Sequence, residues 1–143
     1  KIRGFDIRVQ LYTVPGQVHY DATRKLVLKG VDGVVFVGDS LKVQRKKNIE
    51  SLINLAKNLA EKGVSIRTVP LVLQYNKRDL DGTDSEILPV EVLEKDLNSM
   101  LKVPSFPASA VKGTGVFETL REISKLVVKD VSRKIMLLDK QAK

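Results

Sequence analysis

Three polar side chains, Asn76, Lys77 and Asp79, stand together directly after the apolar run 69–75. A turn needs only one Gly, Asn or Asp, and Asp81 with the glycine after it already supplies that signal. A fixed carboxylate presents two acceptor oxygens, which match the adjacent N1–H and exocyclic amine donors of guanine. Adenine has an acceptor in place of the N1–H, so such a site can discriminate by roughly ten-thousand-fold. Asp79 is therefore a candidate for reading a guanine base.

Neighbouring residues supply the other contacts that a purine base would need. Asn76 could fix the loop and reach the other edge of the base, and the aliphatic stem of Lys77 could lie across the ring plane. Ser109-Ala110 ends a second extended segment about thirty residues further along. The backbone N–H of Ala110 could donate to the guanine carbonyl. A polar turn with a helix cap is the alternative explanation for the Asn-Lys-x-Asp spacing alone.

Hydrophobic periodicity predicts the elements that would position these residues. Alternation with period two predicts a strand with one face toward solvent at the start of the chain, and continuous apolar runs predict buried strands, the first of them covered on both faces. The strand-like segments are residues 5–13, 33–38, 69–75 and 104–109. The helical patterns cover residues 20–30, 48–62, 90–101 and 115–138. Strands alternating with helices predict an α/β fold, with a mostly parallel sheet and helices on both faces.

Apolar side chains at helical spacing indicate which face of each helix is buried. The helix at 20–30 is expected to bury Ala22, Leu26 and Val27, with Gly30 as its stop signal. The stripe expected in the helix at 48–62 consists of Ile49, Leu52, Ile53, Ala56, Leu59 and Ala60. The stripe expected to pack the last helix on the sheet consists of Val116, Leu120, Ile123, Val127, Val131, Ile135 and Leu138. Asp39 and Ser40 are expected to form a turn and a helix start.

Ligands of parallel α/β sheets bind at the carboxyl ends of the strands, in the loops that lead to helices. Three such loops carry unusual residues here, at 13–17, 76–79 and 108–113. The topology predicts that they share one edge of the sheet.

These motifs together resemble a known family. Asn76-Lys77-Arg78-Asp79 and Ser109-Ala110 are similar to the guanine-recognition motifs of Ras-like small GTPases, and the segment 13–17, Thr-Val-Pro-Gly-Gln, resembles their second switch. The amino-acid sequence of four segments is similar, more narrowly, to that of the bacterial polarity and gliding-motility GTPases of the mutual gliding protein A type. These segments are 11–18, 22–37, 74–80 and 115–120. The resemblance covers residues 5–125. It implies a three-layer, Ras-like P-loop NTPase fold and a molecular switch that binds and hydrolyses GTP.

The resemblance also implies roles for single residues. Gly16 would be the backbone donor that senses the terminal phosphate, and Gln17 would be the catalytic side chain that orients the attacking water. Thr13 stands where most small GTPases have Asp, which is a departure of the narrower family. Lys112 is displaced by one position from the usual Ser-Ala-Lys. The nucleotide-binding set that the resemblance implies is Thr13, Gly16, Asn76, Lys77, Asp79, Ser109, Ala110 and Val111.

The cofactors and partners implied are GTP or GDP, Mg²⁺, a roadblock-type GTPase-activating protein and effector proteins. The glycine-rich phosphate loop and the first switch do not occur in residues 1–143, so the magnesium ligands are expected upstream and no metal ligand is assigned here. The catalytic arginine is expected outside residues 1–143, at a position that the sequence does not give. Residues 1–143 would then be the C-terminal two-thirds of one Ras-like domain. The absent first strand would lie between 5–13 and 33–38, and without it the fragment should neither fold normally nor hydrolyse GTP.

Composition excludes several other classes. The sequence contains no cysteine and one histidine, His19, which excludes thiol chemistry and multi-histidine metal centres. His19 lies two residues after Gln17 and is expected to be a solvated surface residue and not a general base. No apolar run reaches the roughly 20 residues needed to span a bilayer, and no signal-peptide pattern opens the chain, so a cytoplasmic location is expected. The net charge of +8 admits a nucleic-acid-binding domain, but aromatic residues are only 5% and the charge fits solvated helix faces better. A guanine-binding scaffold without hydrolysis is the other alternative.

Overall fold

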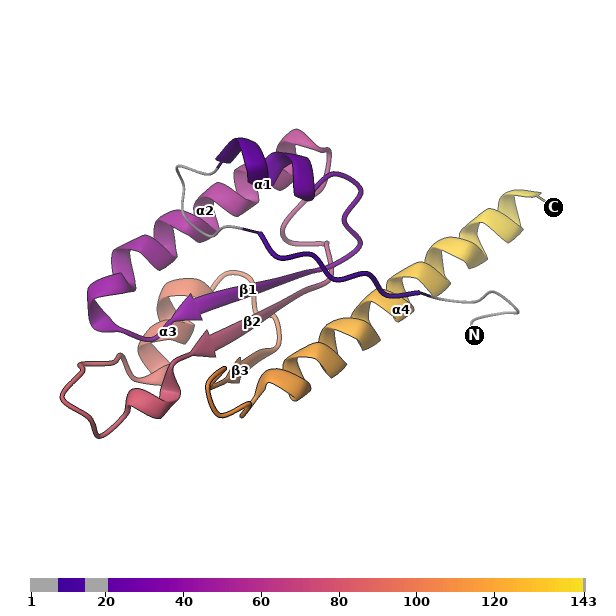
Figure 1. Ribbon diagram of the computed structural model, residues 1–143. Helices are drawn as coiled ribbons and strands as arrows, with labels where there is room; N and C mark the ends of the chain where they lie inside the picture. The colour runs from indigo at the N-terminus through magenta and orange to yellow at the C-terminus, as the bar shows by residue number, and fades with distance from the viewer. Residues whose placement is uncertain (1–7, 15–20, 143) are drawn as a thin grey trace.

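A parallel three-stranded sheet with the strand order β1-β2-β3 lies at the centre of the computed structural model, which describes residues 8–14 and 21–142 (Figure 1). The strands are β1 (Val34–Asp39), β2 (Leu71–Asn76) and β3 (Ser105–Pro107). The helices are α1 (Asp21–Val27), α2 (Arg45–Glu61), α3 (Val90–Leu97) and α4 (Val116–Ala142), with single 3-10 turns η2 (Lys42–Gln44) and η3 (Arg78–Leu80). The predicted α/β class with a parallel sheet is confirmed.

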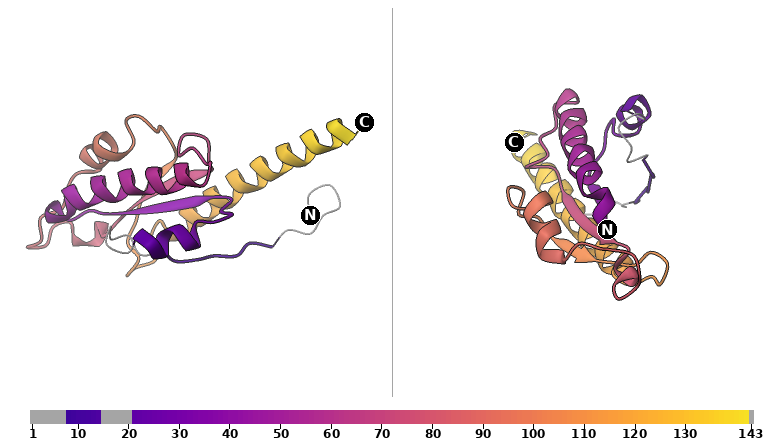
Figure 2. Two further views of the ribbon diagram at one scale, coloured as in Figure 1. Left: turned by 90° about the horizontal axis from the view of Figure 1, so that it is seen from above. Right: turned by 90° about the vertical axis from the view of Figure 1, so that its left-hand side faces the viewer.

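The central strand β2 forms the core because both of its faces are covered. Leu73 and Tyr75 are fully buried on one face, where they join a cluster that includes Leu55 and Leu59 of α2 and Leu93 of α3. The alternate residues of β2 point to the opposite face, which α4 crosses (Figures 1 and 2). Each leucine buried in this way contributes about 1.5–3 kcal/mol to the free energy of folding.

A polar network fastens α3 to the sheet within this core. Glu94 accepts hydrogen bonds from the Tyr75 hydroxyl at 2.7 Å, from the Ser105 hydroxyl, and from Asn98 Nδ2 at 3.1 Å. Burial by itself would raise the pKa of Glu94, but these hydrogen bonds outweigh it, so the pKa lies below its usual value. Burial, followed by the contact with Glu94, raises the pKa of Tyr75. The network therefore holds a charged carboxylate against a neutral phenol.

The long helix α4 packs closely against Gly33, the residue just before β1. A Cβ at this position would lie 2.4 Å from Cγ2 of Val127, so only glycine permits the contact. The last turns of α4 extend past the sheet (Figure 2), and Leu138 is 64% exposed. The predicted stripe therefore packs closely at Ile123 and Val127, but the prediction is wrong for Leu138, and Val116 and Leu120 at the start of the helix are also exposed.

The predicted buried face of α1 is wrong. Leu26 is 77% exposed, whereas Arg24 is 3% exposed and forms the buried contact of the helix. The stripe predicted for α2 is confirmed in part, because Leu59 is buried in the core and Ile49 and Leu52 pack against it. Ile53 is 65% exposed, however, and Leu55 lies in the core instead. The hydrophobic pattern by itself therefore misplaces α1 and part of the buried face of α2.

The predicted strand at 5–13 is not found among residues 8–13, which form no ladder with the sheet; residues 5–7 lie outside the described part. The edge of β1 that faces away from β2 has no partner strand in the described residues. Val37 of β1 is 52% exposed, so the prediction that this strand is covered on both faces is wrong. A strand needs a paired neighbour to form, and the described chain provides none at this edge.

None of the helices in residues 21–142 is both long enough and apolar enough to cross a lipid bilayer.

Candidate functional site

The carboxyl ends of the three strands bring two of the predicted loops together. Asn76 at the end of β2 is in register with Asp39 at the end of β1, and Tyr75 is in register with Pro107 of β3. The backbone of Arg78 donates to the carbonyl of Ala108 at 3.0 Å, which joins the two loops directly. Their predicted shared edge is confirmed by this register.

Asp79 is held in place by one oxygen and leaves the other one available. The hydroxyl of Ser109, a residue only 3% exposed, donates to Asp79 Oδ1 at 2.9 Å. Ser109 Oγ in turn accepts the backbone N–H of Lys112 at 3.2 Å, which fixes the hydroxyl. Within residues 8–14 and 21–142, Asp79 Oδ2 makes no hydrogen bond or ion pair. Oδ1 keeps a second lone pair beside the bond from Ser109, so this fixed carboxylate can still offer both oxygens to a pair of N–H donors.

Asn76 and Ala110 contact each other across the same loops. The backbone N–H of Ala110, which we expect to donate to a guanine carbonyl, donates in this structure to Asn76 Oδ1 at 2.8 Å. A base carbonyl would therefore have to replace Asn76 Oδ1 at this donor or share it. Asn76 thus fixes the loop, as expected, and keeps the N–H directed along the strand end.

Lys77 is anchored by a residue whose contribution the sequence did not reveal. Its ammonium lies 2.8 Å from Asp39 Oδ2, and its backbone has the left-handed φ of 71°. Asp39 is fixed by the backbone N–H of Leu41 at 2.9 Å and by Asn48 of α2, whose amide bonds both backbone groups of Asp39. Asp39 thus forms the expected turn and also directs Lys77. Only proximity across β1 and β2, which a single sequence does not show, could have revealed this pair.

Gly115 closes the second loop against the end of β3. Its φ is +75°, and a Cβ there would lie 2.2 Å from the carbonyl oxygen of Pro107. The nearby Gly113 has the similar φ of +79°, but a Cβ on Gly113 would meet no atom within 4 Å. The close contact at Gly115 keeps the turn that carries Ser109 and Ala110 directly on the strand end.

We expect Gly115→Ala to destabilise the fold by about 2 kcal/mol or more, because left-handed strain adds to a backbone collision. Gly113→Ala is the matched control. It should lower the free energy of unfolding by about 1 kcal/mol, because it introduces the left-handed backbone strain without a collision. Urea denaturation of the two variants measures the difference. Equal losses would contradict the close approach described for Gly115.

The remaining predicted residues are not brought to these loops by any contact within the described ranges. Thr13 is exposed and lines a groove beside β1. Val111 follows Ala110 and is 88% exposed, and the side chain of Lys112 makes no hydrogen bond or ion pair with residues 8–14 or 21–142. Gly16 and Gln17 lie outside the described residues. No group of three or more His, Asp or Glu side chains in the described part of the chain is placed to hold a metal ion.

Comparisons with known proteins show the family of the chain. The model of the ADP-ribosylation factor family matches residues 1–127. Mutual gliding-motility protein MglA of Myxococcus xanthus is 51% identical over 133 residues, which are 93% of this chain and 66% of MglA. ADP-ribosylation factor-like protein 4C of human and of mouse is 27% identical over 128 residues, 86% of this chain and 62% of that protein. The chain spans about two thirds of the length of these curated relatives. It therefore belongs to the ADP-ribosylation factor family of Ras-like small GTPases, as a relative of the gliding-motility protein MglA.

Proposed function

We propose that the protein is a GTP-binding and GTP-hydrolysing molecular switch that acts in gliding motility and cell polarity. The observation that carries the proposal is the carboxylate of Asp79, which Ser109 fixes by one oxygen while the other stays free, within the described residues, at the carboxyl edge of the sheet. Membership of a small-GTPase family and the similarity to a gliding-motility protein support it.

The described loops would bind the guanine end of the nucleotide. Asp79 would accept the N1–H and the exocyclic amine, and its negative charge would strengthen both bonds. Lys77, held by Asp39, would place its half-exposed aliphatic stem over the ring. Ala110 would exchange its hydrogen bond with Asn76 for one to the base carbonyl. Binding would then be selective because adenine leaves the Asp79 carboxylate without a donor.

The phosphate end would be served by residues beyond the described loops. Gln17 would orient a water molecule for attack on the terminal phosphate. The backbone N–H of Gly16 would donate a hydrogen bond to that phosphate, a contact that is lost after hydrolysis. Mg²⁺, when bound, supplies positive charge that stabilises the charge on the phosphates. Its protein ligands are expected upstream, because the phosphate loop and the first switch that would supply them do not occur in residues 1–143.

The free edge of β1 supports the further proposal that these residues are part of a larger Ras-like domain. A groove of about 490 Å³ lies between residues 10–14, α1 and β1, and its lining includes Leu11, Val27, Val35 and Ile123. A strand that pairs with β1 would fill the groove and satisfy the backbone groups of that edge.

Residues 1–143 produced alone should then show low stability and no GTP hydrolysis, whereas the natural polypeptide that includes the upstream residues should be stable and active. Thermal unfolding and phosphate release of the two proteins measure this. Full activity of residues 1–143 alone would refute the proposal that an added strand completes the domain.

The proposed partners are a roadblock-type GTPase-activating protein and effectors that recognise the GTP-bound switch, all in the cytoplasm. Effectors would bind when GTP orders the switch segment and would dissociate when hydrolysis releases it. Its low turnover would rise when the activating partner orders Gln17.

The test follows the fate of the terminal phosphate. The natural polypeptide loaded with γ-labelled GTP should release phosphate, and ATP supplied in parallel should remain intact. Tight GTP binding without phosphate release would support the alternative, a guanine-nucleotide-dependent scaffold. Strong salt-dependent binding to DNA or RNA, with no nucleotide preference, would support the nucleic-acid alternative instead.

A further inference from the structure

Lys77 has a backbone conformation that residues with a side chain rarely adopt. Its φ of 71° and ψ of 26° lie in the left-handed region, which among the non-glycine residues of 8–14 and 21–142 only Lys102 shares. The Cβ makes this conformation unfavourable, so it persists only where the surrounding contacts impose it, and such residues concentrate at binding sites. At Lys77 those contacts come from the ends of all three strands.

The backbone is fixed on both sides of Lys77. The carbonyl of the preceding residue accepts a hydrogen bond from the N–H of Ser40 at 3.1 Å, and the N–H of Arg78 donates to the carbonyl of Ala108 at 3.0 Å. The first bond ties the chain to the residue after β1, the second ties it to the loop after β3, and the left-handed turn lies between them. The side chain of Lys77 reaches the end of β1, where its Nζ lies 2.8 Å from Asp39 Oδ2.

Asp39 is held by residues that lie outside the predicted base-binding set. Its other oxygen, Oδ1, accepts the N–H of Leu41 at 2.9 Å. The amide of Asn48, a residue of α2 that is 8% exposed, accepts the backbone N–H of Asp39 at 3.1 Å and donates to its carbonyl at 2.8 Å. The carboxylate therefore has a fixed position that does not depend on Lys77.

A short ladder of hydrogen bonds keeps the chain after Asp39 in place. The N–H of Leu88 donates to the carbonyl of Ser40 at 2.8 Å, and the N–H of Lys42 donates to the carbonyl of Glu86 at 3.0 Å. The guanidinium of Arg78 donates to the carbonyl of Leu88. Segments 40–42, 86–88 and 76–78 are thus joined to one another, which limits any change in the separation of β1 from the loop after β2.

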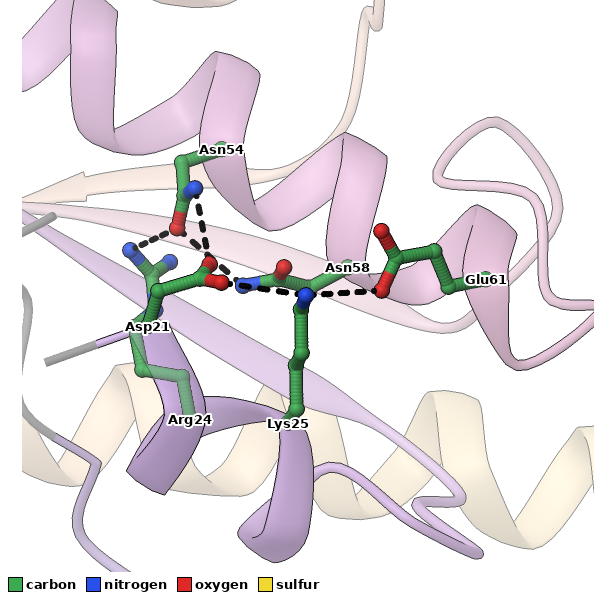
Figure 3. A network of polar contacts seen from close by, with 6 residues as sticks. All are labelled: Asp21, Arg24, Lys25, Asn54, Asn58 and Glu61. Atoms are coloured by element: carbon green, nitrogen blue, oxygen red, sulfur yellow. Dashed lines mark hydrogen bonds and ion pairs between the residues drawn. The ribbon is translucent and has the colours of Figure 1, made fainter.

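Asn48 can support the end of β1 because α2 is itself attached to two other helices. At the start of α2, Arg45 forms two hydrogen bonds with the carboxylate of Asp96 on α3, at 2.7 and 2.9 Å. Further along, Asn54 accepts a hydrogen bond from Arg24 of α1 at 2.8 Å (Figure 3). The support of the ion pair therefore extends from the strand end into the body of the fold.

The ion pair between Lys77 and Asp39 is too exposed to add much to stability by itself. The two side chains are 43% and 27% exposed. Water weakens such a pair, and ordering the long lysine side chain opposes it. Its main consequence is therefore the location of the lysine stem. A stem that is ordered before the base arrives does not have to be ordered on binding, which favours the complex.

We propose that Asp39 is a positioning residue for guanine binding, which holds the ammonium of Lys77 so that the aliphatic stem is in place before the base binds. The inference rests on the proposed function. It adds that a carboxylate on β1, outside both base-recognition motifs, controls how slowly GDP dissociates without touching the nucleotide.

Removing the ion pair from each side tests this. Asp39→Asn keeps an acceptor for the N–H of Leu41 but loses the charge, whereas Lys77→Met keeps an apolar stem but loses the ammonium. In the natural full-length polypeptide, fluorescent GDP chased with unlabelled GDP should dissociate roughly two- to tenfold faster from Asp39→Asn, and at least as fast from Lys77→Met. The double variant should release GDP at the rate of Lys77→Met alone, because Asp39 acts only through the ammonium.

Glu86→Gln is the matched control. Glu86 forms a similar ion pair with Lys42 at 3.3 Å, in which both side chains are exposed and neither is assigned to the base. GDP should dissociate from Glu86→Gln as slowly as from the unmodified protein.

Two results would overturn the inference. One is an unchanged rate of GDP dissociation in Asp39→Asn or in Lys77→Met. The other is a double variant in which the two accelerations multiply, because a merely structural role of Asp39 would add to the loss of Lys77. In both cases GDP binding by the unmodified protein still upholds the proposed function. If the unmodified protein binds no GDP, the proposed function fails and the inference fails with it.

Discussion

Asp79→Asn should lower the affinity for GDP by roughly a hundredfold or more and should transfer the preference to xanthosine diphosphate. The amide of asparagine offers an acceptor to only one of the two guanine donors and turns an N–H toward the other. Xanthine carries an oxygen where guanine carries the exocyclic amine, so the new N–H finds a partner there. Losing the two charge-assisted hydrogen bonds between a carboxylate and the base in a desolvated site reduces the magnitude of the free energy of binding by several kcal/mol. Equilibrium binding with fluorescent GDP and xanthosine diphosphate measures the exchange of preference.

Asp81→Asn is the matched control, since Asp81 carries the same charge two residues away and is exposed. It should leave both affinities unchanged. If Asp79→Asn retained its preference for GDP, another group would have to read the base, and the assignment of Asp79 would be wrong.

Gln17→Leu should slow GTP hydrolysis by roughly a hundredfold while nucleotide affinity stays the same. Leucine has a similar size but cannot hold a water molecule by hydrogen bonds, so it removes a contact made during reaction and not one made on binding. Single-turnover hydrolysis and GDP dissociation rates separate these two effects.

His19→Leu serves as the comparison, because it changes a polar side chain two residues from Gln17 that we expect to be solvated. Its hydrolysis rate should match that of the unmodified protein. A normal rate in Gln17→Leu would remove Gln17 from the mechanism, and a large loss in His19→Leu would mean that the role had been assigned to the wrong residue.

Sequence patterns predicted those elements that bury apolar side chains against the sheet. The apolar run at 69–75 became β2, and Gly63 and Gly30 follow the ends of α2 and α1 with left-handed φ values of 75° and 73°. The Asn-Lys-x-Asp and Ser-Ala motifs were recognisable because their residue types and the strand ends before them occur together. The contact between Ser109 and Asp79 follows from parallel strands sharing one edge.

The patterns failed where polar contacts replace apolar ones. Nothing in the spacing of 20–30 indicates that Arg24 is buried and Leu26 exposed, because the partners of Arg24 lie about thirty residues away on α2. The strand predicted at 5–13 depends on a neighbour that the described chain does not provide at the edge of β1. Residues distant in the sequence determine both the burial of Arg24 and whether a strand forms before α1. The periodicity of a single sequence contains no information on such contacts.

Isothermal titration calorimetry with the natural full-length polypeptide tests the central claim most directly, which is that the carboxylate of Asp79 reads guanine. GDP should bind at least roughly a thousandfold more tightly than ADP, since ADP cannot donate to the carboxylate that Ser109 holds in place. Equal binding of the two diphosphates, or heat from neither, would contradict the account.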